Sequence, residues 1–237
     1  MNQDRILIIT GACGGFGTAV VRALAPEKVK LALADMDAEA LEVLKKDAED
    51  AGAEVLTGVL DITEEASVEA FFAKVKDRYG RADVLLNLPG MSITSPIVDM
   101  PVEDYDKIVD VNLKGLFLAA KHFTPITEAE QNPQMLLISS MAATRANPNA
   151  PVYCAAKAAV SMFAEGYALQ AMKNDIRVTR VKPGPTSTKG FWGDRPVPHE
   201  KFMRPEDVAG VIRFVLELPP HVVMHEVSFE SFLFFKK

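Results

Sequence analysis

The sequence predicts an α/β protein built on a doubly wound parallel sheet of about seven strands, with helices on both faces. Two observations lead to this fold class. Apolar runs of strand length alternate with helical patterns along the whole chain, which is typical of strands joined by crossover helices. The apolar runs are continuous rather than alternating, so the strands are expected to be buried on both faces, as in a parallel sheet.

The first half of the chain supplies four predicted strands and three helices. The continuous apolar run RILIIT at 5–10 predicts a buried strand, and TAVVRALA at 18–25 follows it with helical spacing. KLALAD at 30–35 is the next strand, and the helix after it is expected to stop at Gly52. The other elements of this half are strands at 54–61 and 83–88 and a helix at 67–79.

The second half continues the same alternation. A helical pattern covers 105–123, QMLLISS at 134–140 predicts a strand, and a long helix is expected from about 153 to 173. Proline is favoured in the first turn of a helix, which suits Pro205. The remaining elements are a strand at 176–182, a helix from Pro205 to about 218 and a closing strand at 221–229.

Length and composition favour a single domain over residues 1–237. Apolar residues make up 49% and charged residues 24% of the 237 positions, and the chain has no internal repeat or low-complexity segment. One irregular stretch, at about 187–203, is long enough to suggest a functional loop, and we expect it to contact the substrate.

Several classes of partner and location are disfavoured. The net charge is −6 with no basic cluster, so no nucleic-acid partner is expected. No signal-peptide pattern or run of 18 apolar residues predicts export or a membrane contact. Cys13 and Cys154 do not suggest a disulfide framework. A cytoplasmic protein with reduced thiols is expected.

The segment TGACGGFG, at residues 10–17, follows the first strand and opens the first helix. Gly11 would permit a tight turn, Gly15 would let the backbone approach phosphates, and Gly17 would let the helix pack closely on the sheet. The spacing is a variant of the commoner dinucleotide fingerprint. An ordinary strand–helix turn is the alternative interpretation of this loop taken alone.

Asp35 ends the second predicted strand, about 20 residues after the loop, where an acidic side chain can bind the adenosine ribose. Asp35 and Asp37 could instead cap the following helix, and the two roles are compatible if Asp37 is the cap. A carboxylate at this position repels a 2′-phosphate, and no Lys or Arg stands beside it. We therefore predict NAD(H) as the cofactor, in preference to NADP(H).

Tyr153 and Lys157 are spaced i, i+4 and therefore share one helix face. An ammonium close to a phenol favours the phenolate and is expected to lower the tyrosine pKa, which suits acid–base catalysis. The alternative is an ordinary surface pair on an amphipathic helix.

Taken together, these motifs resemble the short-chain dehydrogenase/reductase family. The match rests on TGACGGFG, Asp35, the DIT at 61–63, Asn87 with Gly90, Asn112, Ser140, Tyr153 with Lys157, and PGPTST at 183–188, in family order. The resemblance implies a Rossmann-like fold. It implies that Tyr153 is the acid/base, that Lys157 holds the nicotinamide ribose, that Ser140 bonds the substrate oxygen and that Asn112 supports a water relay. Ser139 is interpreted as structural.

The resemblance also implies the cofactor contacts. They are Gly11, Gly15, Phe16, Gly17, Asp35, Met36, Asp61, Ile62, Asn87, Pro89, Gly90, Tyr153, Lys157, Pro183, Gly184, Thr186 and Thr188. The chain departs from the family at Leu88–Pro89, where Asn-Ala is usual, and in its C-terminal tail, which lacks the usual glycines. Pro89 lacks a backbone donor, so the loop near the nicotinamide could differ.

The implied activity is NAD(H)-dependent oxidoreduction between an alcohol and a ketone or aldehyde. A non-catalytic NAD-binding sensor and an epimerase or dehydratase on the same scaffold are the alternatives. The implied partner is a small alcohol or carbonyl substrate, and no metal is expected because the histidines lack ligand spacing.

The substrate pocket is expected to include Met91, Met141, Phe191 and Trp192. Gly190 and Gly193 flank the two aromatic residues, which suggests a lid, whereas a static loop is the alternative. Arg145 could meet an anionic substrate but is interpreted as a solvated arginine. A homodimer or homotetramer is expected through the apolar faces of the helices at 105–123 and 153–173, and the aromatic tail FLFF is expected to cover a subunit interface.

Overall fold

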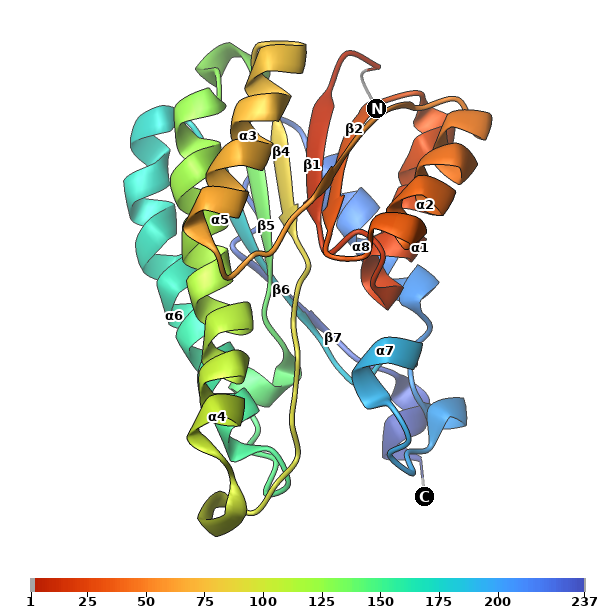
Figure 1. Ribbon diagram of the computed structural model, residues 1–237, viewed down its shortest axis with the longest axis vertical. Coiled ribbons are helices and arrows are strands. Elements are labelled where there is room, and N and C mark those ends of the chain that lie inside the picture. Colours follow the sequence, from red (N-terminus) through yellow and green to blue (C-terminus); the bar gives the residue numbers. More distant parts are fainter. Residues whose placement is uncertain (1–2, 237) are drawn as a thin grey trace.

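The computed structural model describes residues 3–236 and contains one parallel sheet of seven strands in the order β3-β2-β1-β4-β5-β6-β7 (Figure 1). The chain runs outward from β1 to β3 and then returns past β1 to build the other half of the sheet. This reversal confirms the predicted doubly wound sheet. The strands are β1 (Ile6–Thr10), β2 (Lys30–Asp35), β3 (Glu54–Val59), β4 (Val84–Asn87), β5 (Gln134–Ile138), β6 (Arg177–Pro183) and β7 (Glu226–Phe229).

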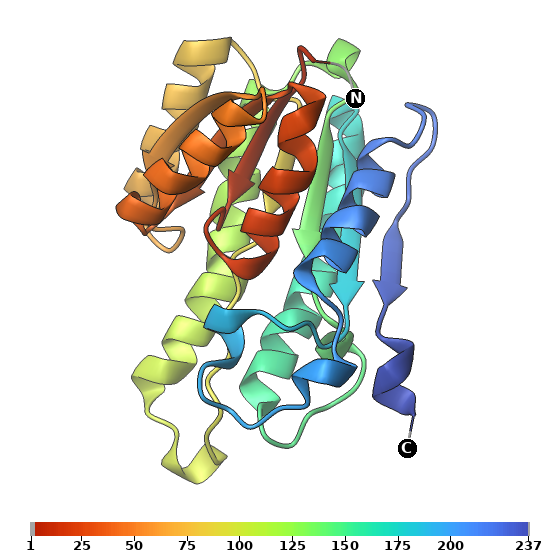
Figure 2. The same ribbon diagram turned by 90° about the vertical axis from the view of Figure 1, so that its right-hand side faces the viewer.

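Helices cover both faces of the sheet (Figures 1 and 2). One face carries α1 (Gly15–Leu24), α2 (Ala38–Asp50) and α8 (Pro205–Leu216). The other carries α3 (Glu65–Tyr79), α4 (Val102–Val109), α5 (Gly115–Phe123) and α6 (Pro151–Ala171).

Each face of the sheet has its own apolar core. Successive residues of a strand point to opposite faces, so Leu7 and Ile9 of β1 pack under α1 and α8, whereas Ile6 and Ile8 pack under α3 and α5. All four side chains are almost fully buried. This two-sided burial is why the strands read as continuous apolar runs.

Local signals fix several helix ends. The Asp37 carboxylate accepts a hydrogen bond from the Ala40 N–H at 2.9 Å and caps α2. Gly80 ends α3 with φ +81°, a conformation that glycine adopts without strain. Asp207 accepts from the Arg204 N–H at 2.8 Å at the start of α8, just before Pro205.

Three segments differ from the sequence expectation. The helical stretch expected at 105–123 is divided by the π-helical turn Asp110–Lys114 between α4 and α5. The last strand begins at Glu226 rather than 221, because the chain first forms a turn in which the Val222 N–H bonds the Pro219 carbonyl. The irregular stretch at 187–203 contains a short helix, α7 (Lys189–Trp192).

Within residues 3–236, no helix combines the length and the apolar character needed to cross a membrane.

Candidate active site

The glycine loop is held between β1 and the start of α1. Gly11 has φ +68°, and a Cβ there would lie 3.0 Å from the Pro89 nitrogen. A Cβ on Gly17 would lie 2.3 Å from the Gly11 carbonyl oxygen, and one on Gly15 would lie 2.6 Å from Thr188. Side chains are therefore excluded from all three positions, and the N-terminus of α1 stays open to an anionic ligand.

Asp35 lies beside this loop, at the end of β2. Its carboxylate accepts hydrogen bonds from the Cys13 N–H at 2.9 Å and the Asp37 N–H at 3.3 Å. Burial, with the nearby Asp35 and Asp37 carboxylates, raises the pKa of the Cys13 thiol to about 12, so this thiol is neutral at physiological pH. Asp37, not Asp35, caps α2, so the Asp35 carboxylate remains available at the mouth of the loop.

The segment after β4 crosses the loop and leads to the catalytic end. The Leu88 N–H bonds the Thr10 carbonyl at 3.2 Å, and Pro89 packs against Gly11. The backbone hydrogen bond to the glycine loop thus comes from Leu88. Pro89, which has no N–H, contacts the loop by packing alone. Asn87 is 4% exposed, and its Oδ1 accepts from the Thr10 hydroxyl at 3.0 Å. The Asn87 side chain thus joins β4 to β1.

Tyr153 and Lys157 lie one turn apart on α6, as their spacing predicts. The Lys157 Nζ is 5.9 Å from the centre of the Tyr153 ring and donates a hydrogen bond to the Ile138 carbonyl at 2.9 Å. Lys157 is only 3% exposed. Its ammonium therefore lines the cavity at the end of β5.

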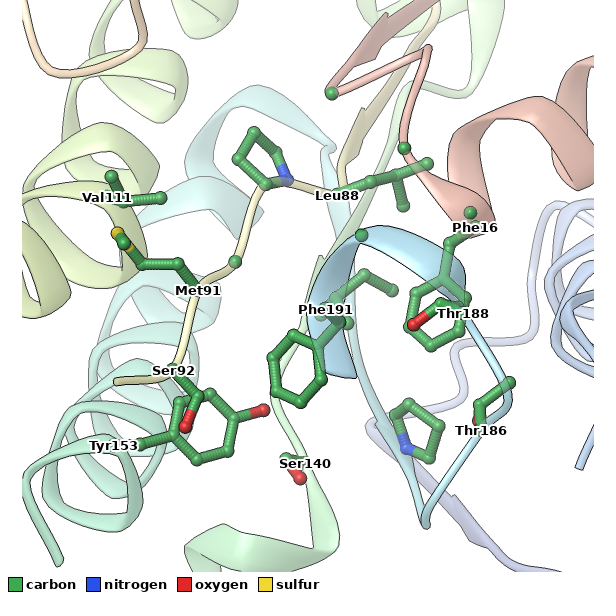
Figure 3. A pocket seen from close by; sticks show the side chains of 18 of the residues that line it. Phe16, Leu88, Met91, Ser92, Val111, Ser140, Tyr153, Thr186, Thr188 and Phe191 are labelled. Carbon is green, nitrogen blue, oxygen red and sulfur yellow. The ribbon is translucent and has the colours of Figure 1, made fainter. Parts of the chain in front are cut away.

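Ser140 follows β5 and faces Tyr153 (Figure 3). Its hydroxyl accepts a hydrogen bond from the Ala142 N–H at 3.1 Å, which fixes the side chain at the start of a short 3₁₀ turn. Two hydroxyl groups, one from the end of a strand and one from a helix, thus meet at one point.

The free protein has a higher Tyr153 pKa than the sequence suggested. Burial raises the pKa of Tyr153 to about 12, while a hydrogen bond with Ser140 and the charge of Arg195 act in the opposite direction. Burial also lowers the pKa of Lys157 to about 8. Both shifts have the same cause, because the enclosed site disfavours either charged form.

Asn112 lies in the π-helical turn between α4 and α5. Its Nδ2 donates to the Ile108 carbonyl at 2.8 Å and to the Met91 carbonyl at 2.9 Å. Its Oδ1 is buried and has no hydrogen-bond partner among residues 3–236. A Cβ on Gly90 would lie 3.3 Å from this Oδ1 and 3.2 Å from the Lys157 Nζ. The two polar groups therefore approach the same small space beside Gly90.

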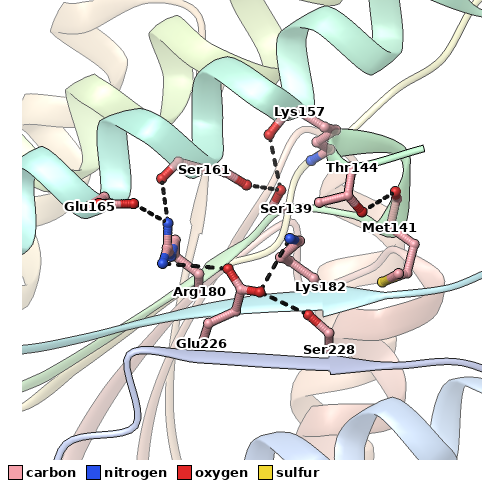
Figure 4. A network of polar contacts seen from close by, with 10 residues as sticks. All are labelled: Ser139, Met141, Thr144, Lys157, Ser161, Glu165, Arg180, Lys182, Glu226 and Ser228. Atoms are coloured by element: carbon pink, nitrogen blue, oxygen red, sulfur yellow. Dashed lines mark hydrogen bonds and ion pairs between the residues drawn. The ribbon is translucent and has the colours of Figure 1, made fainter. Parts of the chain in front are cut away.

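A polar network behind the site ties α6 to three strands (Figure 4). The Ser139 hydroxyl donates to the Lys157 carbonyl at 3.0 Å and contacts the Ser161 hydroxyl at 2.7 Å. Arg180 of β6 pairs with Glu165 of α6 at 2.7 Å and with Glu226 of β7 at 3.4 Å. These contacts hold the helix that carries Tyr153 and Lys157.

One cavity of about 1060 Å³ runs from the glycine loop to Tyr153. Every site residue expected from the sequence lines it except Asn87 and Asn112, which lie behind the lining. The cavity therefore joins the groove along the glycine loop to a space beside Tyr153 and Ser140 (Figure 3).

Aromatic side chains form the outer wall beside Tyr153. The Phe191 ring lies edge-on to the Tyr153 ring at 5.6 Å, and Trp192 lies edge-on to Phe191 at 5.2 Å. The Trp192 Nε1 donates to the Thr186 carbonyl at 2.6 Å, which anchors α7 to the segment after β6. Phe202 packs on Trp192 at 5.1 Å.

The sequence did not place several residues in this wall. Phe234 of the C-terminal tail packs on Phe202 at 6.1 Å and lines the cavity, so this part of the tail lies within its own chain. Arg145 also lines the cavity; its side chain is half exposed, as expected of a solvated arginine, and it pairs with Glu230. Ser92 and Arg195 line the cavity as well. Their only sequence signal is proximity to a motif or an aromatic run.

The comparisons with known proteins agree with this geometry. A family model described as short chain dehydrogenase matches residues 5–196. An uncharacterized oxidoreductase of Staphylococcus haemolyticus is 32% identical over 95% of this chain and 96% of its own length.

Two solved structures have the same fold. An alcohol dehydrogenase from the archaeon Thermococcus sibiricus, complexed with 5-hydroxy-NADP, is 28% identical, with a TM-score of 0.90 over 97% of each chain. An NAD⁺-bound xylitol dehydrogenase is 25% identical, with a TM-score of 0.87 over 98% of this chain and 100% of that one. The resemblance seen in the sequence is therefore confirmed: the chain belongs to the short-chain dehydrogenase/reductase family of oxidoreductases.

Proposed function

We propose that the protein is an NAD(H)-dependent oxidoreductase that interconverts an alcohol and a ketone or aldehyde. The observation that carries this proposal is the single cavity that joins the glycine loop and Asp35 to Ser140, Tyr153 and Lys157. Both solved relatives are named as dehydrogenases of alcohols, which supports this reaction class.

The residues along the groove fit a nicotinamide dinucleotide. The glycines leave the N-terminus of α1 open for the pyrophosphate, and Asp35 would bind the adenosine ribose. Asp61 and Ile62 would contact the adenine, and the segment 183–188 would contact the nicotinamide. When bound, the nicotinamide supplies the hydride donor or acceptor.

NAD(H) fits this groove better than NADP(H). Cys13, Met36 and Asp37 line the cavity with Asp35, and none of them carries a positive charge that could pair with a 2′-phosphate. The Asp35 carboxylate would repel that phosphate. The relatives bind either cofactor, so this preference rests on the charge at the end of β2.

The protein's own groups would move the proton. In reduction, the Tyr153 phenol donates its proton to the substrate oxygen, to which Ser140 also donates a hydrogen bond; in oxidation, the phenolate accepts the proton. Because its pKa is raised, Tyr153 is protonated in the protein without cofactor. The Lys157 ammonium holds the nicotinamide ribose, and Asn112 supports a water relay to Lys157 from beside Gly90.

We also propose that residues 1–237 act as one domain and that the segment at about 187–203 is its substrate loop. Phe191 and Trp192 would close over the substrate and exclude water from the hydride-transfer site.

The test is turnover by purified protein with NADH and a panel of ketones and aldehydes, followed by the absorbance of the reduced nicotinamide. Tyr153→Phe removes only the hydroxyl, so it should abolish turnover and leave NAD binding, measured by calorimetry, within about twofold. Tyr79→Phe is the matched control, because it removes the same hydroxyl from a tyrosine that does not line the cavity.

Comparable activity in Tyr153→Phe would remove Tyr153 from the mechanism. NAD binding with no turnover across the panel would favour a sensor. Substrate conversion without net change in the cofactor would favour an epimerase or dehydratase.

A further inference from the structure

Charge is unevenly distributed along the cavity. Among the described residues that line it, the carboxylates are Asp35, Asp37 and Asp61, which belong to the β2 and β3 side of the sheet. The cations are Arg145, Lys157 and Arg195, which belong to the Tyr153 side. The substrate end of a protein with net charge −6 is therefore lined by cations and by no carboxylate.

Two of the three cations already have partners or a role. The Arg145 guanidinium forms an ion pair with Glu230 and lies over the Phe235 ring, 5.7 Å from its centre. Lys157 is buried, donates to the Ile138 carbonyl and belongs to the proton-transfer site. Arg195 is the cation that remains.

Arg195 is held in place by neutral groups alone. Its Nε donates to the Trp192 carbonyl at 2.8 Å, its Nη2 to the Phe191 carbonyl and its Nη1 to the Thr94 hydroxyl at 3.2 Å. The guanidinium also lies over the Phe191 and Trp192 rings, 5.3 and 5.0 Å from their centres. No carboxylate of residues 3–236 pairs with it.

The position of Arg195 relates it directly to the chemistry. Phe191, on which the guanidinium lies, has its ring edge against Tyr153. A guanidinium has five N–H donors, so two remain after these three bonds. Aromatic faces and backbone carbonyls orient the group without neutralising it, which prepares it for a planar anion.

We propose that Arg195 binds a carboxylate of the substrate, so that the protein acts on hydroxy acids and the corresponding oxo acids. This inference rests on the proposed oxidoreductase function. A carboxylate is favoured because a single arginine fork matches its two oxygens and balances its one charge. The substrate carbonyl would then lie at Tyr153 and Ser140, with its acid group toward the loop.

The test uses matched pairs of an oxo acid and its methyl ester: pyruvate, acetoacetate and levulinate, which place the carboxylate at increasing distance from the ketone. For the best pair, wild-type kcat/KM with NADH should favour the acid. Arg195→Gln should reduce the acid-to-ester ratio by about tenfold or more, because one charge-assisted interaction is lost. Arg195→Lys should keep part of the preference, and Arg145→Gln should keep it nearly whole.

A binding measurement tests the same site without turnover. Trp192 is the only tryptophan, and Arg195 lies over its ring, so its emission reports on the guanidinium. With NAD present, butyrate should change this emission saturably in the wild type and in Arg145→Gln, but not in Arg195→Gln. Butyramide, which is neutral, should have no such effect.

The outcomes separate this inference from the proposed function. Turnover of esters and acids with a ratio unchanged by Arg195→Gln supports the oxidoreductase and overturns the carboxylate site. If Arg195→Gln lowered kcat/KM equally for the acid and the ester, Arg195 would act on Tyr153. If it weakened NAD binding, Arg195 would contact the cofactor. Either result would overturn the carboxylate site. An Arg195-dependent butyrate response without turnover of any ketone would support the site and remove the proposed function.

Discussion

Lys157 illustrates at the residue scale how a buried charge is both a cost and a function. Its ammonium donates a hydrogen bond to the Ile138 carbonyl and has almost no contact with solvent. Burial lowers its pKa from 10.5 to about 8, so the folded protein without cofactor holds this charge at a free-energy cost.

This cost gives a pH-dependent prediction for stability. Below about pH 8 Lys157 is protonated in both the folded and the unfolded protein, so the free-energy cost of burying its charge is fully present. Between about pH 8 and 10.5 the folded protein releases the proton while the unfolded protein keeps it, so the free energy of unfolding rises with pH. Lys157→Met should therefore be more stable than the wild type at about pH 7, and its advantage should shrink by about 1–2 kcal/mol at about pH 9.5.

Urea unfolding of the protein without cofactor measures this difference. Lys46→Met, at an exposed position of α2, is the control and should show no pH-dependent change. If Lys157→Met were more stable than the wild type by the same amount at both pH values, burial would not lower the pKa of Lys157.

Asp35 should decide which cofactor is used. NAD should be preferred in the wild type, and the double change Asp35→Ser with Met36→Arg should lower the NAD-to-NADP ratio of kcat/KM by about tenfold or more, because a repulsive charge is replaced by an attractive one. Met36 is 67% exposed, so the new side chain can be accommodated. Met36→Arg alone separates the two effects. Faster wild-type turnover with NADP would contradict this reading of Asp35.

At the scale of elements, the C-terminal tail and the loop at 187–203 form one wall. Rings follow one another from Tyr153 through Phe191, Trp192 and Phe202 to Phe234. The tail thus reaches the substrate end of the cavity through packing, although it is more than 80 residues away from Tyr153 in the sequence.

Removing the ring of Phe234 should open this wall. Phe234→Ala should raise the KM for substrates with a large apolar group by about fivefold or more, because about 1–3 kcal/mol of apolar contact is lost. The KM for small substrates should change little. Phe232→Ala is the matched control, because Phe232 is 74% exposed and does not line the cavity. Steady-state kinetics with a short and a long ketone make the comparison; equal effects of the two changes would exclude the tail from the substrate site.

At the scale of the whole molecule, apolar side chains remain exposed on the helices that cover one face of the sheet. They are Tyr105, Phe117, Met162, Leu169 and Met172, from α4, α5 and α6 with the turn after it. The sequence pattern led us to expect subunit contacts on these helices, and the exposure of these side chains is what such contacts require.

The protein should therefore be a dimer or tetramer by light scattering. Leu169→Glu should weaken the assembly, because a charge would be buried in an apolar contact. Val43→Glu, at an exposed position of α2 on the opposite face, should leave the mass unchanged. A wild-type mass of one chain at micromolar concentration would contradict the expected assembly.

The sequence by itself determined the sheet, the order of its elements and most of the candidate site. The strands are buried on both faces, so their apolar runs are continuous and visible without a structure. Local constraints are equally visible: glycine is required at Gly11 and Gly17 by backbone contacts, and the spacing of Tyr153 and Lys157 places them on one face of a helix.

Tertiary structure alone decided what surrounds those residues. Burial raises the Tyr153 pKa, where the spacing to Lys157 led us to expect a lower one, and burial is a property of the packed cavity rather than of residue spacing. Asn87 turns toward Thr10 because β4 pairs with β1. Arg145 pairs with Glu230, which comes from the far end of the chain, whereas Arg195 meets aromatic rings, backbone carbonyls and the Thr94 hydroxyl. Such contacts join distant segments, and no local pattern encodes them.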